Sequence, residues 1–86
     1  MPERISWTLA AWKDYEYWQG QDRKTPRRVN ALIQDCLRNP HSGIGKPEPL
    51  RENLIGYWSR RIDDVNRLVY RSTTLDLIII SCRYHY

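Results

Sequence analysis

The sequence contains no phenylalanine and has only two cysteines and two histidines. Cys36 and Cys82 each fall within an apolar pattern, and neither belongs to a CxxC pair. Two isolated thiols of this kind fit a reducing compartment better than a disulfide framework. His41 and His85 are 44 positions apart and have no neighbouring cluster of cysteines or carboxylates, so their spacing does not make a metal-ligand set. We therefore expect neither a metal nor another cofactor.

Long apolar segments are missing as well. No charged-then-apolar leader opens the chain, and no apolar run reaches about 18 residues, the length at which a membrane-spanning helix is considered. We expect a cytoplasmic protein that is neither secreted nor bound to a membrane. With 86 residues, the chain should form a single domain, residues 1–86, with a small core that leans on a partner for stability.

The net charge of +4 is concentrated in the middle of the chain. Residues 23–62 hold nine basic groups against three acidic ones, whereas residues 1–22 are net acidic and residues 63–86 are balanced. Most of the basic groups are arginines, whose planar guanidinium binds phosphate with two parallel hydrogen bonds. This composition favours a polyanionic partner, with nucleic acid first. Composition alone fits a basic but unspecialised surface equally well.

Two helices are predicted in the first half of the chain. Thr8 is a suitable N-cap for a helix that carries apolar residues at three-residue steps and ends at Gly20. The second helix has the clearer periodicity and ends at Asn39-Pro40. Its apolar positions are Val29, Leu32, Ile33, Cys36 and Leu37. Its start is open, because either Asp22 or Thr25 is a possible cap. The short turn between the helices predicts an antiparallel hairpin.

The second half of the chain has the alternating pattern of strands. After a loop over residues 41–49, strands are predicted at residues 57–62, 65–71 and from 75 to 83 or beyond, separated by turns at 63–64 and 73–74. Residues 4–7 form a short first strand. The order β-α-α-β-β-β predicts an α+β domain in which the helical hairpin packs on one face of a twisted antiparallel sheet.

The phase of the predicted strands suggests where chemistry takes place. In the last strand, Ile78, Ile80, Cys82 and Tyr84 form the better core face, which leaves Arg83 and His85 on the opposite face. Arg67 and Arg71 also point away from the more apolar set of their strand. A sheet face with arginines, a histidine and tyrosines can hold phosphates and stack bases.

RNA cleavage without a metal needs a base for the 2′-hydroxyl, a cation for the charge on phosphorus and an acid for the departing 5′-oxygen. Glu48, held between Pro47 and Pro49, is a workable base, an arginine is the natural cation and a histidine is the natural acid.

Each of these residues also has a simple structural interpretation. Glu48 fits a solvated loop carboxylate, and His85 fits a surface histidine near a chain end. Arg67 fits an ion pair with Asp63 or Asp64 in the adjacent turn. His41 is better explained as a cation at the end of the second helix than as a catalytic group. Local sequence does not decide between these interpretations and catalysis.

Taken together, these residues closely resemble the YoeB toxins, a family within the wider RelE-like group. The resemblance covers essentially the whole chain. The motifs that carry it are 45–50 (GKPEPL), 56–62 (GYWSRRI), 67–70 (RLVY) and 82–86 (CRYHY), with Trp12, Asp14, Tyr15 and 17–19 in the first helix. The glutamate between two prolines and the His-Tyr end are specific as a combination. Two positions depart from the pattern: Asn66, where a histidine is expected before Arg67, and Pro26, which bears only on where the second helix starts.

The resemblance implies the fold of small microbial ribonucleases and a ribosome-dependent endoribonuclease that cuts messenger RNA in the decoding site. In this family, Glu48 matches the general base, His85 the general acid and Arg67 the arginine that stabilises the transition state. Tyr86 matches a terminal tyrosine that positions or stacks on the substrate. The motifs also imply RNA phosphate contacts by Lys46, Arg60 and Arg61, and the strand phase adds Arg83. The implied partners are a YefM-like antitoxin, the ribosome, messenger RNA and a second copy of the chain.

Two other functions remain open from the sequence. One is a non-catalytic protein of the same fold that binds gyrase, as in the ParE-like branch. The other is an inhibitor that blocks the ribosome by occupancy alone. Neither requires the combination of Glu48, Arg67 and His85, which therefore favours the enzyme.

Overall fold

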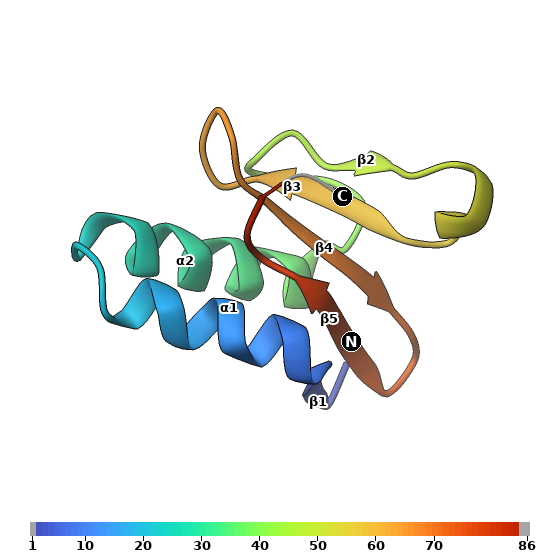
Figure 1. The fold of residues 1–86 in the computed structure, drawn as a ribbon. Coiled ribbons are helices and arrows are strands. Elements are labelled where there is room, and N and C mark those ends of the chain that lie inside the picture. Colours follow the sequence, from blue (N-terminus) through green and yellow to red (C-terminus); the bar gives the residue numbers. More distant parts are fainter. Residues whose placement is uncertain (1, 85–86) are drawn as a thin grey trace.

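The computed structural model describes residues 2–84 and shows two helices packed on one face of a five-stranded sheet (Figure 1). The sheet order is β1-β5-β4-β3-β2. The elements are β1 (Arg4–Trp7), α1 (Leu9–Gln19), α2 (Lys24–Arg38), β2 (Glu48–Pro49), the 3₁₀ turn η1 (Glu52–Leu54), β3 (Trp58–Arg61), β4 (Arg67–Ser72) and β5 (Asp76–Ser81).

The predicted α+β class, with its helical hairpin on one face of the sheet, is confirmed. Two details differ from the prediction. β1 pairs with β5 in parallel, with Ile5 opposite Leu77, so the sheet is mixed rather than purely antiparallel. The short strand β2 is an additional element at the edge of the sheet, paired antiparallel with β3. This strand carries Glu48, the predicted general base.

Helix α1 begins and ends where its sequence predicts. The hydroxyl of Thr8 accepts a hydrogen bond from the backbone N–H of Ala11 at 3.1 Å, and Gly20 is the C-cap residue. The apolar face predicted from Leu9, Trp12, Tyr15 and Trp18 is correct only toward the end of the helix. Trp18 is buried and Tyr15 packs against the core, whereas Leu9 is 82% exposed, because three-residue steps drift around a helix with 3.6 residues per turn.

Helix α2 supplies most of the helical core. Four of its five predicted apolar positions are buried and Leu37 is half-buried, which confirms the periodicity. Its start follows the first of the two alternatives: a carboxylate oxygen of Asp22 accepts from the N–H of Thr25 at 2.9 Å, and Pro26 lies in the first turn. Asn39 ends the helix, as predicted.

The predicted phase of β5 is wrong before Ser81. Beyond it, Cys82 is buried as predicted, whereas Tyr84, also predicted on the core face, is 56% exposed. Leu77 and Ile79 are the fully buried residues, while Ile78 and Ile80 are only half-buried. A β-bulge explains the change: Val69 pairs with Ser81 but Tyr70 pairs with Ile79, so Ile80 is an extra residue. Beyond the bulge the phase is reversed, and Cys82 joins the core under the helices.

No helix within residues 2–84 is long and apolar enough to cross a membrane.

Candidate active site

Glu48 and Arg67 meet on the face of the sheet that lies away from the helices. Glu48 pairs with Ser59 of β3, and Ser59 pairs with Val69 of β4, so these three side chains lie in one row across the sheet. Arg67 is two residues before Val69 and therefore on the same face. Its Nη1 donates a hydrogen bond to Oε1 of Glu48 at 3.2 Å.

The two partners of this ion pair differ in exposure. The Glu48 side chain is 53% exposed, whereas that of Arg67 is only 15% exposed. The alternative in which Arg67 pairs with Asp63 or Asp64 is not what the structure shows, because its ion-pair partner is Glu48. A partly exposed carboxylate beside a largely buried cation gives an accessible base and a fixed positive charge, the first two requirements for 2′-hydroxyl attack.

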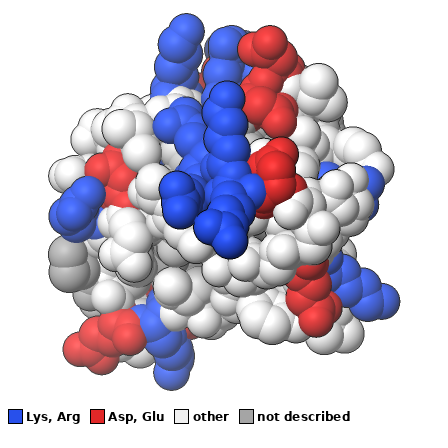
Figure 2. All heavy atoms as spheres, turned by 90° about the vertical axis from the view of Figure 1, so that its left-hand side faces the viewer, with Lys and Arg blue, Asp and Glu red and all other residues white. Residues whose placement is uncertain are grey.

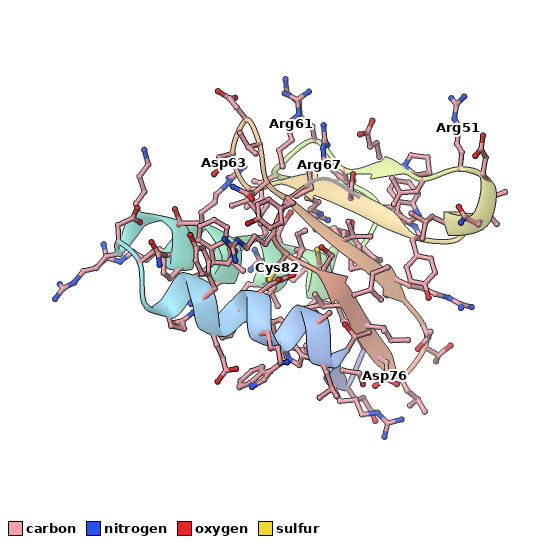
Figure 3. All side chains as sticks on the ribbon, viewed as in Figure 1. Arg51, Arg61, Asp63, Arg67, Asp76 and Cys82 are labelled. Carbon is pink, nitrogen blue, oxygen red and sulfur yellow. The ribbon has the colours of Figure 1, made fainter. Side chains whose placement is uncertain are left out.

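The surroundings of Glu48 leave room for a ligand. A pocket of about 620 Å³ opens beside it and is lined by residues 48–54, including the turn η1. Arg61 pairs with Arg67 across β3 and β4 and is exposed. Figure 3 shows Arg61 and Arg67 near the turn that carries Asp63, while Arg51 lies toward the opposite end of this edge. Lys46, two residues before Glu48, is also exposed.

The predicted contact of Arg60 with RNA phosphate is wrong, because the Arg60 side chain is fully buried. All five of its N–H donors are used inside the protein. Nε donates to the hydroxyl of Tyr70 at 3.0 Å, and Nη1 donates to Oδ2 of Asp35 at 2.6 Å. The remaining three hydrogen bonds go to the carbonyl oxygens of Asn39, Ser42 and Ile44.

The Arg60 guanidinium thereby organises the loop that leads to Glu48. This loop passes so close to its partners that two glycines are required. A Cβ on Gly43 would lie 2.0 Å from Oδ2 of Asp35, and a Cβ on Gly45 would lie 2.7 Å from Leu32, with positive φ at both positions. The sequence shows alternation of Arg60 with Arg61 but does not show which one is buried. Asp35, a carboxylate beside the apolar stripe of α2, is the signal that a buried cation is its partner.

The pKa values in this region follow from burial and hydrogen bonding. The N–H of Ile44 and the guanidinium of Arg60 both donate to Asp35 and hold the pKa of its carboxyl below its usual range. Burial raises the pKa of the Cys36 thiol to about 11 and that of the Cys82 thiol to about 12. Both thiols are therefore neutral structural groups at physiological pH.

The segment after β5 is anchored by side chains from α1. The backbone N–H of Cys82 donates to Asp14 at 3.1 Å, and its carbonyl accepts from Nε1 of Trp18 at 2.6 Å. The Arg83 guanidinium lies 3.4 Å from the ring centre of Tyr17 and 4.5 Å from that of Tyr84. Arg83 is thus stacked on an aromatic ring of α1, which differs from its predicted place on the face with the other arginines. His85 and Tyr86, the predicted acid and terminal tyrosine, lie outside the described residues.

Basic side chains also gather at one end of the molecule. Figure 2 views it from the side where α2 begins and β3 turns into β4, and shows a column of basic groups flanked by acidic ones. A pocket at this end is lined by Lys24, Arg27 and Arg28, together with Asp22 and Asp63. The basic character of the middle of the chain is therefore spatially clustered as well.

Residues 7–86 match the family model described as the YoeB-like toxin of bacterial type II toxin–antitoxin systems. The chain is 54% identical to the toxin YoeB of Streptomyces coelicolor over 83 residues, which cover 96% of this chain and 99% of that protein. Its fold is similar to that of a YoeB/ParE toxin from Agrobacterium tumefaciens, with a TM-score of 0.92 and 46% identity over 96% of this chain and 99% of the other.

YoeB of Staphylococcus aureus is similar along its whole length, and its structures include a dimer and a complex with YefM. The dimer has a TM-score of 0.91 and 42% identity to this chain, and the YoeB–YefM complex has a TM-score of 0.89 and 41% identity. Both cover 100% of each chain. The chain belongs to the YoeB family, the toxins of bacterial type II toxin–antitoxin systems.

Proposed function

We propose that this toxin is an endoribonuclease that cleaves messenger RNA in the decoding site of the ribosome and so inhibits translation. The observation that carries the proposal is the contact between Glu48 and Arg67, which joins a carboxylate of β2 to a cation of β4 at 3.2 Å. A protein that only binds its target requires no such pairing of a base with a phosphate-binding cation.

The proposed reaction is a transesterification followed by release of two products. Glu48 takes the proton of the 2′-hydroxyl, and the 2′-oxygen attacks the adjacent phosphorus. Arg67 stabilises the negative charge that develops on the phosphorane oxygens. His85 donates a proton to the 5′-oxygen as its bond to phosphorus breaks. The products are a 2′,3′-cyclic phosphate and a 5′-hydroxyl, so protons and bonds balance without a metal.

The remaining predicted residues have supporting roles in this proposal. Tyr86 positions or stacks on the substrate next to the acid. The exposed Lys46 and Arg61 contact phosphates of the message or of the ribosomal RNA. Arg83 is stacked on Tyr17 and contributes less to RNA binding than Lys46 and Arg61 do. Arg60 has no role in RNA binding and instead supports the loop before Glu48.

We further propose that the toxin is held inactive by a YefM-like antitoxin and works as a homodimer. The complex and the dimer of the Staphylococcus aureus relative support both partners, since that protein is similar along the whole length of this chain.

Primer extension on messages from a reconstituted translation reaction tests the proposed activity. Glu48→Gln and His85→Gln should each reduce cleavage by about 10²–10⁴-fold, the usual contribution of one acid–base group. Glu16→Gln, which removes an exposed carboxylate from α1, is the matched control and should cut at the wild-type rate. Translation arrest with intact messages would instead favour inhibition by binding.

A further inference from the structure

The side chain of Asn66 connects the β3–β4 turn to the segment that precedes the terminal His-Tyr pair. Its Nδ2 donates to both carboxylate oxygens of Asp63, at 3.1 Å each. Its Oδ1 accepts a hydrogen bond from the backbone N–H of Tyr84 at 2.7 Å. A carboxylate accepts only, so Asp63 fixes the orientation of the amide and directs its oxygen toward Tyr84. Asn66 therefore acts as a rigid bridge between two segments.

Asp63 is itself held by the turn. One of its carboxylate oxygens accepts from the backbone N–H groups of Val65 and Asn66, at 2.8 and 2.7 Å. Desolvation acts to raise the pKa of Asp63, but the hydrogen bonds from Asn66 and Val65 outweigh it and lower this pKa, so the carboxylate is charged across the physiological range. The acceptor that orients the Asn66 amide is therefore fixed both in position and in charge.

Tyr84 needs such support because its backbone is strained. Its φ is +65°, in the left-handed region that costs a residue other than glycine about 1 kcal/mol or more. Asn66 holds its N–H, and the N–H of Arg67 donates to its carbonyl at 3.2 Å. Two consecutive residues of β4 and its turn thus hold both sides of the Tyr84 backbone. One of them, Arg67, also contacts Glu48.

We infer that Asn66 is a positioning residue for the catalytic acid, because it holds the backbone of Tyr84, the residue that directly precedes His85, in its left-handed conformation. This inference rests on the proposed function. Asn66 occupies the position where the family pattern favours a histidine, and its amide provides there the acceptor that the Tyr84 N–H requires. Its location next to Arg67 links the placement of the acid to that of the cation.

Asn66→Ala removes the bridge and leaves Arg67 in place. At saturating ribosome concentration, cleavage should fall by about 10–100-fold, since a small misplacement of a catalytic group costs up to about 10²-fold, while KM should change little. The matched control is Asn30→Ala on α2. It removes another asparagine whose side-chain oxygen accepts a hydrogen bond, in this case from the hydroxyl of Tyr15 at 2.7 Å. This control should cut at the wild-type rate.

A message with sulfur in place of the scissile 5′-oxygen separates positioning of the acid from a general structural effect. A thiolate leaves without a proton, because the pKa of a thiol is near 8.5. The defects of Asn66→Ala and of His85→Gln should both shrink on this substrate, whereas the defect of Glu48→Gln should persist. An Asn66→Ala defect of equal size on both messages would overturn the inference.

If Asn66→Ala fails to fold, exchanging the amide of Asn66 with the carboxylate of Asp63 provides a second test. Asn66→Asp keeps the acceptor for Tyr84 but places two carboxylates side by side, and it should cut slowly. Adding Asp63→Asn restores one amide and one carboxylate and should recover most of the wild-type rate. Failure of that recovery in a folded double variant would contradict the inference.

If the wild-type toxin cuts neither message, the proposed function has failed instead. Failure of the inference and failure of the proposed function are therefore distinguishable.

Discussion

Glu48 and Arg67 are 19 positions apart in the chain, yet Oε1 of the first lies 3.2 Å from Nη1 of the second. The short strand β2 produces this contact by adding Glu48 to the edge of β3, in the same row as Ser59 and Val69. The carboxylate at this edge position is half exposed, whereas the arginine side chain is only 15% exposed.

The first prediction concerns Arg67. Arg67→Ala should lower kcat by about 10²–10³-fold with a smaller effect on KM, because its charge matters most as the phosphorane forms. Arg71→Ala, on the same strand but exposed, is the matched control and should leave both constants near their wild-type values. Steady-state cleavage rates over a range of concentrations of programmed ribosomes measure both constants. A change confined to KM would make Arg67 a substrate-binding residue only.

The second prediction concerns the buried ion pair of Arg60 and Asp35. Arg60→Ala removes the buried cation beside the Asp35 carboxylate and a donor to three carbonyl groups, and should lower the free energy of unfolding by about 3–5 kcal/mol. Arg38 contacts the same carboxylate at 3.5 Å but is 65% exposed, so Arg38→Ala should cost less than about 1 kcal/mol. Urea unfolding followed by tryptophan fluorescence compares the two. Equal effects would show that burial of Arg60 does not matter.

The third prediction is the pH dependence caused by Asp35. Its pKa is lower in the folded state than the value of about 3.9 expected in the unfolded chain. The ionised carboxylate therefore stabilises the fold fully above the unfolded-state pKa, and this contribution is lost as pH falls through the folded-state pKa. Asp35→Asn should show a weaker loss of stability between about pH 5 and pH 2 than the wild type. The control is Asp64→Asn, which removes an exposed acid of the β3–β4 turn and should keep the pH dependence of the wild type. An unchanged pH dependence of stability in Asp35→Asn would contradict the role given to Asp35.

The fourth prediction concerns the two thiols. Burial raises their pKa values to about 11 for Cys36 and about 12 for Cys82, so both remain protonated and covered at pH 8. A thiol-specific disulfide reagent should label neither in the folded protein and both after denaturation. Rapid labelling of the native protein would show that the core around α2 and β5 opens easily.

The sequence predicts the helices better than it predicts the faces of the strands. The 3.6-residue period of α2 identifies its buried side because a regular helix never changes phase. In β5 a single extra residue, Ile80, shifts the phase, and alternation of apolar residues does not show where a bulge occurs. Sequence reasoning therefore assigns Ile78 and Ile80 to the core in place of Leu77 and Ile79.

The same limit applies to the site. Resemblance to a family assigns roles to Glu48 and Arg67, and the structure brings these two together. For Arg60, however, the motif alone suggests an RNA contact, while burial depends on Asp35, which is 25 positions away in the chain. Long-range partners of this kind are set by tertiary packing, which is why Asn66 is visible in the sequence only as a departure from a pattern.

In the proposed mechanism, Glu48 activates the 2′-hydroxyl of the message as the nucleophile. A message that carries a single 2′-deoxynucleotide at the mapped cleavage position, translated alongside the unmodified message, tests this step. The unmodified message should be cut to leave a 2′,3′-cyclic phosphate end, and the message should stay intact at the deoxy position. Cleavage at the same phosphate of the deoxy message would contradict the proposed mechanism.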